Sequence, residues 1–235
     1  IPADDKELIH TVITAPRFNT MMMKNYVNDI DIRTEVQFSA VTFELCDGTI
    51  FVAFRGTDDN LIGWKEDLNM TFQCPIPSQE KSVDYLNKVK SKVKKIRVGG
   101  HSKGGNLAVY ASAFCNPAIK RRILAVYNND GPGFSEEITN SDGYLEILPL
   151  THSIIPQSSL VGKMLAHKED FKIVFSTGVG GMLQHDPFTW QLLGTSFIPA
   201  KEQSVSSRLV EKTLQDWLLH VERADRQKIV DGFYS

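Results

Sequence analysis

The stretch GHSKG at positions 100–104 places Ser102 between two glycines, each two residues away. A β-rich stretch at 95–100 precedes the serine, and small apolar residues at 104–114 follow it. Gly-x-Ser-x-Gly between a strand and a helix is typical of the sharp turn that exposes a nucleophilic serine. In so tight a turn the neighbouring side chains would collide, and glycines relieve that crowding. The pattern therefore predicts that Ser102 is the nucleophile of an acyl transfer, ahead of a glycine-rich turn that binds phosphate or merely closes tightly.

A serine nucleophile needs a general base, which follows the nucleophile in the chain order typical of this turn. The sequence has six histidines: His10, His101, His152, His167, His185 and His220. His185 lies in a glycine-rich loop after the last predicted strand, where an imidazole can return over the strand ends. We therefore predict His185 as the base, with His152 as the rival. His101 is expected to point away from the nucleophile, because the two residues are adjacent.

The third member of such a site is an acid that orients the imidazole and stabilises the imidazolium. Asp130 follows the predicted strand 121–129 and stands beside a Gly-Pro turn, so we predict it as the acid; capping of that turn is its structural alternative. Asp186 is the second choice, because an aspartate next to a histidine in sequence rarely reaches the ring nitrogen well. The segment 148–168, where many hydrolases carry the acid, has no Asp or Glu.

The helix that follows Ser102 aims its free N–H groups and its dipole at the place where an oxyanion would form. The backbone N–H of Lys103 is the expected donor there. A lysine side chain in the first helical turn opposes the dipole, so we expect it to turn into solvent. The alternative is that it receives a negatively charged group of the substrate. A second donor is expected from an earlier strand end, at 55–57.

Strand patterns occur at six places: 35–45, 49–54, 95–100, 121–129, 144–150 and 170–177. Helix patterns occur at four: 79–93, 104–114, 158–165 and 204–221. This alternation predicts an α/β fold with a mainly parallel sheet and helices on both faces. We expect one domain over 1–235, with a helical or irregular lead-in at 1–34 and C-terminal helices at 204–235. The methionine run 21–23 and the stretch 70–77 are interpreted as core.

Composition excludes several classes of function. A net charge of −2 gives no reason to expect nucleic acid or an anionic membrane as a partner. Three scattered cysteines indicate neither a disulfide framework nor a zinc site, and they favour a reducing, cytoplasmic compartment. No apolar run approaches the roughly 20 residues that span a bilayer. The chain begins without Met or signal-peptide features, so we expect a fragment or processed chain and leave an upstream targeting segment open.

Three motifs carry a family resemblance: FRGT at 54–57, GWKEDL at 63–68 and GGHSKGGNLA at 99–108. They resemble the lipase class 3 group of α/β hydrolases, and more closely its bacterial Mbeg-like branch, over about 17–190. The resemblance implies that Thr57 is an oxyanion-hole residue and that Asp67 is structural, binding backbone near Arg55. Where class 3 lipases carry Asp-x-Val-Pro, this chain has Ser-Ile-Ile-Pro at 153–156, so the family position of the acid is lost.

Together these patterns predict an α/β-hydrolase fold and a serine esterase or lipase-like hydrolase that acts on a small-molecule or lipid ester. Acyl transfer of this kind needs no metal or cofactor. The alternative from another class is a binding or scaffold protein that keeps the turn at Ser102 for backbone reasons and has lost turnover. Peptidase and acyltransferase activities are not separated from esterase activity by the sequence, nor is the oligomeric state defined.

Overall fold

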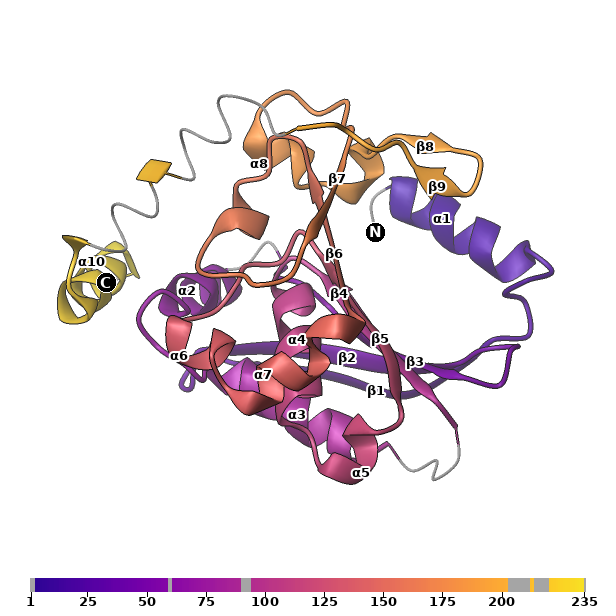
Figure 1. The fold of residues 1–235 in the computed structure, drawn as a ribbon, viewed down its shortest axis with the longest axis horizontal. Coiled ribbons are helices and arrows are strands. Elements are labelled where there is room, and N and C mark those ends of the chain that lie inside the picture. The colour runs from indigo at the N-terminus through magenta and orange to yellow at the C-terminus, as the bar shows by residue number, and fades with distance from the viewer. Residues whose placement is uncertain (1–2, 59–60, 90–93, 203–211, 214–219, 235) are drawn as a thin grey trace.

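A seven-stranded sheet with the strand order β1-β2-β3-β4-β5-β6-β7 organises the protein, seen in a computed structural model that describes residues 3–58, 61–89, 94–202, 212–213 and 220–234 (Figure 1). The strands are β1 (Met22–Asp31), β2 (Val36–Glu44), β3 (Ile50–Phe54), β4 (Ile96–His101), β5 (Ile123–Asn129), β6 (Thr151–Pro156) and β7 (Phe171–Val174). The pairs β1–β2 and β2–β3 are antiparallel, and β3 to β7 are parallel. The predicted α/β fold with a mainly parallel sheet is confirmed.

Helices occupy most of the connections. The larger ones are α1 (Ala3–Thr14), α2 (Leu61–Asn69), α3 (Pro77–Asn87), α4 (Lys103–Phe114), α7 (Asp142–Ile147) and α10 (Arg223–Tyr234). The short ones are α5 (Pro117–Lys120), α6 (Glu136–Thr139), α8 (Gly181–Gln184) and the 3₁₀ turns η1 (Leu148–Leu150), η2 (Val161–Lys163) and η3 (Pro187–Thr189). A small separate hairpin joins β8 (Leu192–Leu193) to β9 (Ser196–Phe197).

Helices α3, α4 and α7 pack side by side on one face of the sheet. The parallel strands follow one another in chain order, and right-handed crossovers then place the connecting helices on the same face. In Figure 1, α1 and the β8–β9 hairpin lie on the other side of strands β4 to β6. That second face is less covered than helices on both faces would imply, because Phe51 and Tyr127 are only half-buried and Leu124 is 40% exposed.

The core lies between the sheet and α4. Val52, Val98 and Val126, on three neighbouring strands, are each 0% exposed. They belong to one cluster with Leu107 and Ala111 of α4. The sheet, α3 and α7 surround α4. A helix of small apolar residues fits this enclosed position, and the packing around it holds its first residue, Lys103, in one place.

The strand predicted at 144–150 is wrong. These residues form the last four positions of α7 and the turn η1, and the strand begins only at Thr151. Tyr144 and Ile147 are each 1% exposed, whereas Leu145 is 42% exposed. The i, i+3 spacing of the buried pair is helical, and Ser141 caps the helix by accepting a hydrogen bond from the Tyr144 N–H.

The lead-in is more ordered than predicted, since β1 forms an edge strand within it. The methionine run was wrongly assigned to the core: Met22 and Met23 are 51% and 66% exposed. In the stretch 70–77, by contrast, Met70 and Ile76 are buried as expected.

Three predicted helices have different limits in the structure. The helix expected at 79–93 is α3, which begins at Pro77 and ends at Asn87, and 90–93 lie outside the described residues. The helix expected at 158–165 is only the three-residue turn η2. Most of the helix expected at 204–221 also lies outside the described residues. The described C-terminal helix is α10.

Candidate functional site

Ser102 stands at the turn between β4 and α4, with φ 57° and ψ −133°. A positive φ is strained for any residue with a β-carbon, and such strain is characteristic of sharp turns at functional sites. The turn is held by a hydrogen bond of 3.0 Å from the Ser102 N–H to the Asn129 carbonyl on β5. A β-carbon on Gly100 would overlap the backbone of Gly104, and one on Gly104 would overlap the carbonyl of Phe54. The predicted crowding at both glycines is therefore present.

The structure brings His185 to Asp130. His185 Nδ1 lies 2.7 Å from Asp130 Oδ2, and the Asp130 side chain is 0% exposed. The other carboxylate oxygen, Oδ1, accepts a hydrogen bond from the Ser159 hydroxyl. Asp186 instead accepts a hydrogen bond of 2.9 Å from the Phe188 N–H and caps η3. Of the two predicted acids, Asp130 alone contacts the imidazole.

His101 supports the loop that carries His185, a contact that the sequence analysis missed. Its Nε2 lies 2.7 Å from the His185 carbonyl oxygen, and the two rings lie 4.5 Å apart. Burial and the neighbouring His185 lower the pKa of His101 to about 4, so His101 is neutral at pH 7. A neutral imidazole with a proton on Nε2 donates that hydrogen bond. The position of His101 beside Ser102 was the only signal for this role in the sequence.

The rival base His152 does not reach Ser102. Across the sheet, His101 pairs with Asn129, and Asn129 pairs with Ile154, so these three residues lie at one level. Ser102 lies one residue beyond this level and His152 lies two residues before it. The two residues are therefore three positions, or about 10 Å, apart along the strands. The exposed ring of His152 stacks on Tyr127 at 5.5 Å.

The Ser102 hydroxyl itself makes no hydrogen bond with a group that the structure describes.

Thr57 lies beside the turn at Ser102. A β-carbon on its neighbour Gly56 would lie 2.8 Å from the His101 carbonyl oxygen and 3.2 Å from Ser102 Cβ. The Thr57 hydroxyl donates to Asp67, whose Oδ2 and Oδ1 lie 2.6 and 2.8 Å away. Asp67 therefore binds this hydroxyl, not backbone near Arg55 as expected.

The pKa of the Asp67 carboxyl is raised. Burial raises its pKa to about 6, although the Lys103 ammonium and the Thr57 hydroxyl act in the opposite direction. At neutral pH Asp67 is thus mostly ionised and accepts the Thr57 hydrogen bond.

The side chain of Lys103 contradicts both expectations made for it. It is 1% exposed, and its ammonium lies 2.9 Å from Glu66 Oε2. It turns neither into solvent nor toward a substrate, because carboxylates of α2 surround it beneath the turn. Only the backbone N–H of Lys103 is available at the site, since the first N–H of a helix has no carbonyl acceptor within that helix.

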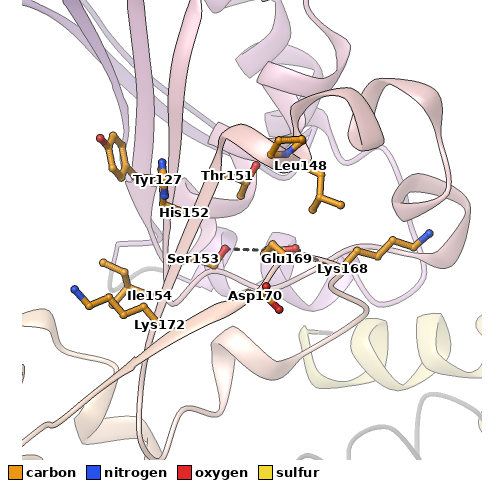
Figure 2. Close-up of a pocket in the computed structure, with 11 residues that line it drawn as sticks. Tyr127, Leu148, Thr151, His152, Ser153, Ile154, Lys168, Glu169, Asp170 and Lys172 are labelled. Carbon is orange, nitrogen blue, oxygen red and sulfur yellow. Dashed lines mark hydrogen bonds between the residues drawn. The ribbon is translucent and has the colours of Figure 1, made fainter. Parts of the chain in front are cut away.

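Ser102 and His185 line neither of two clefts in the described part of the molecule. Figure 2 shows the larger, of about 660 Å³, at the amino-terminal end of β6. Its walls include Tyr127, His152, Ser153, Lys168, Glu169 and Lys172. The second, of about 490 Å³, lies between residues 70–74, residues 134–137 and two arginines of α10.

Glu169, in the larger cleft, carries a buried hydrogen-bond network. Its carboxylate accepts hydrogen bonds from Ser153 Oγ at 2.9 Å, the dashed line of Figure 2, and from Tyr144 Oη at 2.6 Å. His167 Nδ1 lies 3.1 Å from Glu169 Oε1. Burial alone would raise the pKa of Glu169, but the hydrogen bonds from His167 and Tyr144 outweigh it and lower the pKa to about 2.

We expect Glu169→Gln to lower the free energy of unfolding by about 3 kcal/mol at pH 7. A depressed carboxyl pKa stabilises the fold above the unfolded value near 4.5, and this contribution is lost as the pH falls toward 2. The difference from wild type should therefore shrink below pH 4 in urea titrations. The exposed neighbour Asp170→Asn is the control and should stay within about 0.5 kcal/mol of wild type. A difference that does not depend on pH would contradict this account.

No group of three His, Cys, Asp or Glu side chains suited to a metal ion occurs among the described residues. The three cysteines are all free thiols. In the described part of the chain, no helix has both the length and the apolar character to span a bilayer.

The mainly parallel sheet and the strained serine turn between β4 and α4 are typical of an α/β-hydrolase fold. The chain belongs to the Mbeg1-like family, whose model matches residues 12–235. This confirms the predicted resemblance, and the match extends beyond both ends of the expected range.

Three of the solved structures that match the chain do so at low sequence identity. A fungal lipase–inhibitor complex, described as a model for interfacial activation in lipases, is 14% identical with a TM-score of 0.45, over 66% of this chain and 66% of that one. M37 lipase is 15% identical with a TM-score of 0.45, over 67% of this chain and 62% of that one. An acetyl xylan esterase from Paenibacillus sp. R4 is 12% identical with a TM-score of 0.32, over 92% of this chain and 93% of that one. The chain thus spans about two thirds of the length of either lipase. No curated protein matches the sequence.

Proposed function

We propose that this protein is a serine hydrolase that cleaves carboxylic esters through an acyl-enzyme on Ser102. The observation that carries the proposal is the 2.7 Å contact between His185 Nδ1 and the fully buried Asp130 carboxylate. Both groups lie at the carboxyl end of the parallel strands, next to the strained turn at Ser102. A carboxylate on Nδ1 holds the imidazole in the tautomer whose Nε2 can accept a proton.

In the first half of the reaction, Ser102 Oγ attacks the ester carbonyl and its proton passes to His185 Nε2. The new Oγ–C bond gives a tetrahedral oxyanion. When the oxyanion collapses, the bond to the alcohol breaks, and the alcohol takes the proton from Nε2. In the second half, water loses a proton to Nε2 and attacks the acyl-enzyme. The Oγ–C bond then breaks, the proton on Nε2 returns to Ser102 Oγ, and the acid leaves.

The oxyanion needs fixed donors on the side of Thr57 and Lys103. The Lys103 N–H, at the start of α4, is one. The N–H of Thr57 has no acceptor among the described groups and is the second. The Thr57 hydroxyl is held by Asp67, which fixes the residue in place beside Ser102.

A fluorophosphonate probe tests the proposal, because it labels only an activated serine. We expect wild-type protein to be labelled, and Ser102→Ala and His185→Ala to lose labelling. His152→Ala is the matched control: it removes an imidazole that lies away from Ser102 and should label at the wild-type rate. Labelling that survives Ser102→Ala would overturn the assignment of the nucleophile.

A second function is a binding or scaffold protein that retains the fold without turnover. The lack of a hydrogen bond on the Ser102 hydroxyl among the described groups favours it. The same experiment separates the two: a well-folded wild-type protein that takes no label supports the scaffold.

A further inference from the structure

Beneath the turn at Ser102 lies a buried ion pair between Lys103 and Glu66, which the reaction scheme above does not use. The two side chains are 1% and 0% exposed, and Nζ lies 2.9 Å from Glu66 Oε2. Neither side chain can meet a substrate in this position. Burying two charges removes both from water, and an apolar pair of similar volume would fill the same space without that cost. The ion pair therefore needs an explanation other than packing.

Glu66 joins four elements of the fold at one carboxylate. Its Oε2 accepts from the Gln37 N–H on β2 at 3.1 Å as well as from Lys103 at the start of α4. Its Oε1 accepts from the N–H and the hydroxyl of Ser78, in the first turn of α3, at 3.0 and 2.5 Å. Glu66 itself lies on α2. With four donors on two oxygens, the carboxylate is fully hydrogen-bonded and holds α2 in one place.

The Lys103 ammonium also reaches the Thr57 loop by two routes. It donates to Gln37 Oε1 at 3.2 Å, and the same oxygen accepts the N–H of Asp58, the residue after Thr57, at 3.3 Å. It lies 3.8 Å from Asp67 Oδ1, and Asp67 binds the Thr57 hydroxyl. One end of Lys103 thus supplies an oxyanion donor, and the other end is tied to the loop that supplies the second.

We propose that the Lys103–Glu66 ion pair is a positioning device that sets the distance between the two oxyanion donors, the N–H groups of Lys103 and Thr57. The inference rests on the proposed function and deepens it. Small displacements of an oxyanion donor affect the transition state far more than the bound substrate, because the negative charge develops only in the transition state. The ion pair therefore acts on kcat and leaves KM nearly unchanged.

The test removes both charges together, since loss of one would leave the other buried and unpaired. The variant is Lys103→Met with Glu66→Gln, which keeps the backbone N–H of residue 103 and shortens only that side chain, by one atom. We expect kcat for p-nitrophenyl acetate to fall about 100-fold, with KM within about twofold of wild type. The inhibition constant of a trifluoromethyl ketone, which forms an oxyanion on the serine, should rise by a similar factor. The control is Lys81→Met with Asp29→Asn, which removes an ion pair between α3 and β1 whose Nζ and Oδ2 atoms lie 2.7 Å apart. This control should change neither kcat nor the inhibition constant.

Each outcome decides the proposal. A folded double variant with wild-type kcat and inhibition constant overturns the positioning role and leaves the proposed function standing. A wild-type protein that neither cleaves esters nor takes a fluorophosphonate label removes the proposed function and this inference together. If the double variant does not fold, Gln37→Met decides, because it keeps the ion pair and removes the amide group whose oxygen links Lys103 to Asp58. We expect it to lower kcat about 10-fold, and an unchanged kcat would overturn the proposal.

Discussion

Replacing Ser102 by alanine is expected to lower kcat for a carboxylic ester by about 10⁴- to 10⁶-fold. The expectation follows from the proposed acyl-enzyme: without Oγ no covalent intermediate forms, and only water held near His185 can attack. The Lys103 and Thr57 N–H groups remain, so we expect residual hydrolysis above the uncatalysed rate. Steady-state kinetics with p-nitrophenyl acetate, and the loss of any burst of p-nitrophenol, would measure the effect.

The control for this variant is Ser112→Ala, a buried serine on α4 whose hydroxyl donates to the Ala108 carbonyl at 2.7 Å. It removes the same atom type from the helix that follows Ser102, ten residues further along, and kcat should stay within about twofold of wild type. If Ser102→Ala kept a kcat within 10-fold of wild type, another group would have to be the nucleophile.

Asp130→Asn should have the second largest effect, a fall in kcat of about 10⁴-fold with the fold intact. The amide is nearly isosteric, and its oxygen can still accept from the Ser159 hydroxyl, as Asp130 Oδ1 does. Its NH₂ group, however, donates a hydrogen bond to His185 Nδ1, which moves the imidazole proton to Nε2. The base is then in the wrong tautomer to accept a proton from Ser102, and the imidazolium also loses its neighbouring carboxylate. Steady-state kinetics, with circular dichroism to establish folding, would measure this.

Asp186→Asn is the matched control for the acid. It makes the same substitution at the residue next to His185, and the amide oxygen can still accept the Phe188 N–H that Asp186 binds. We expect kcat within about threefold of wild type. Equal losses for the two variants would show that the contact between His185 and Asp130 is not the one that matters for turnover.

Part of this site could be predicted because it depends on a few adjacent residues. The turn at Ser102 is such a case: the clash that a β-carbon at Gly100 or Gly104 would cause lies within the turn and its neighbouring strand, so the pattern of types is sufficient. The strand before the turn and the small apolar helix after it follow from period and composition in the same way. The helix α7 was mistaken for a strand because a short apolar run has no clear period. Its end at η1 depends on the start of β6.

What the sequence alone determined is the turn, the class of fold and the position of His185 after Ser102, since each is encoded in local pattern and chain order. Tertiary structure decided which acid meets His185: Asp130 is 55 residues away, and the choice over the adjacent Asp186 depends on how β5 and the loop after β7 converge. Tertiary structure also decided where the Lys103 side chain lies. A lysine in the first turn of a helix is expected in water, but here Gln37 and Glu66, from β2 and α2, surround its ammonium. Buried charges are placed by partners that are distant in sequence, because only the folded chain brings opposite charges close enough to offset the loss of water.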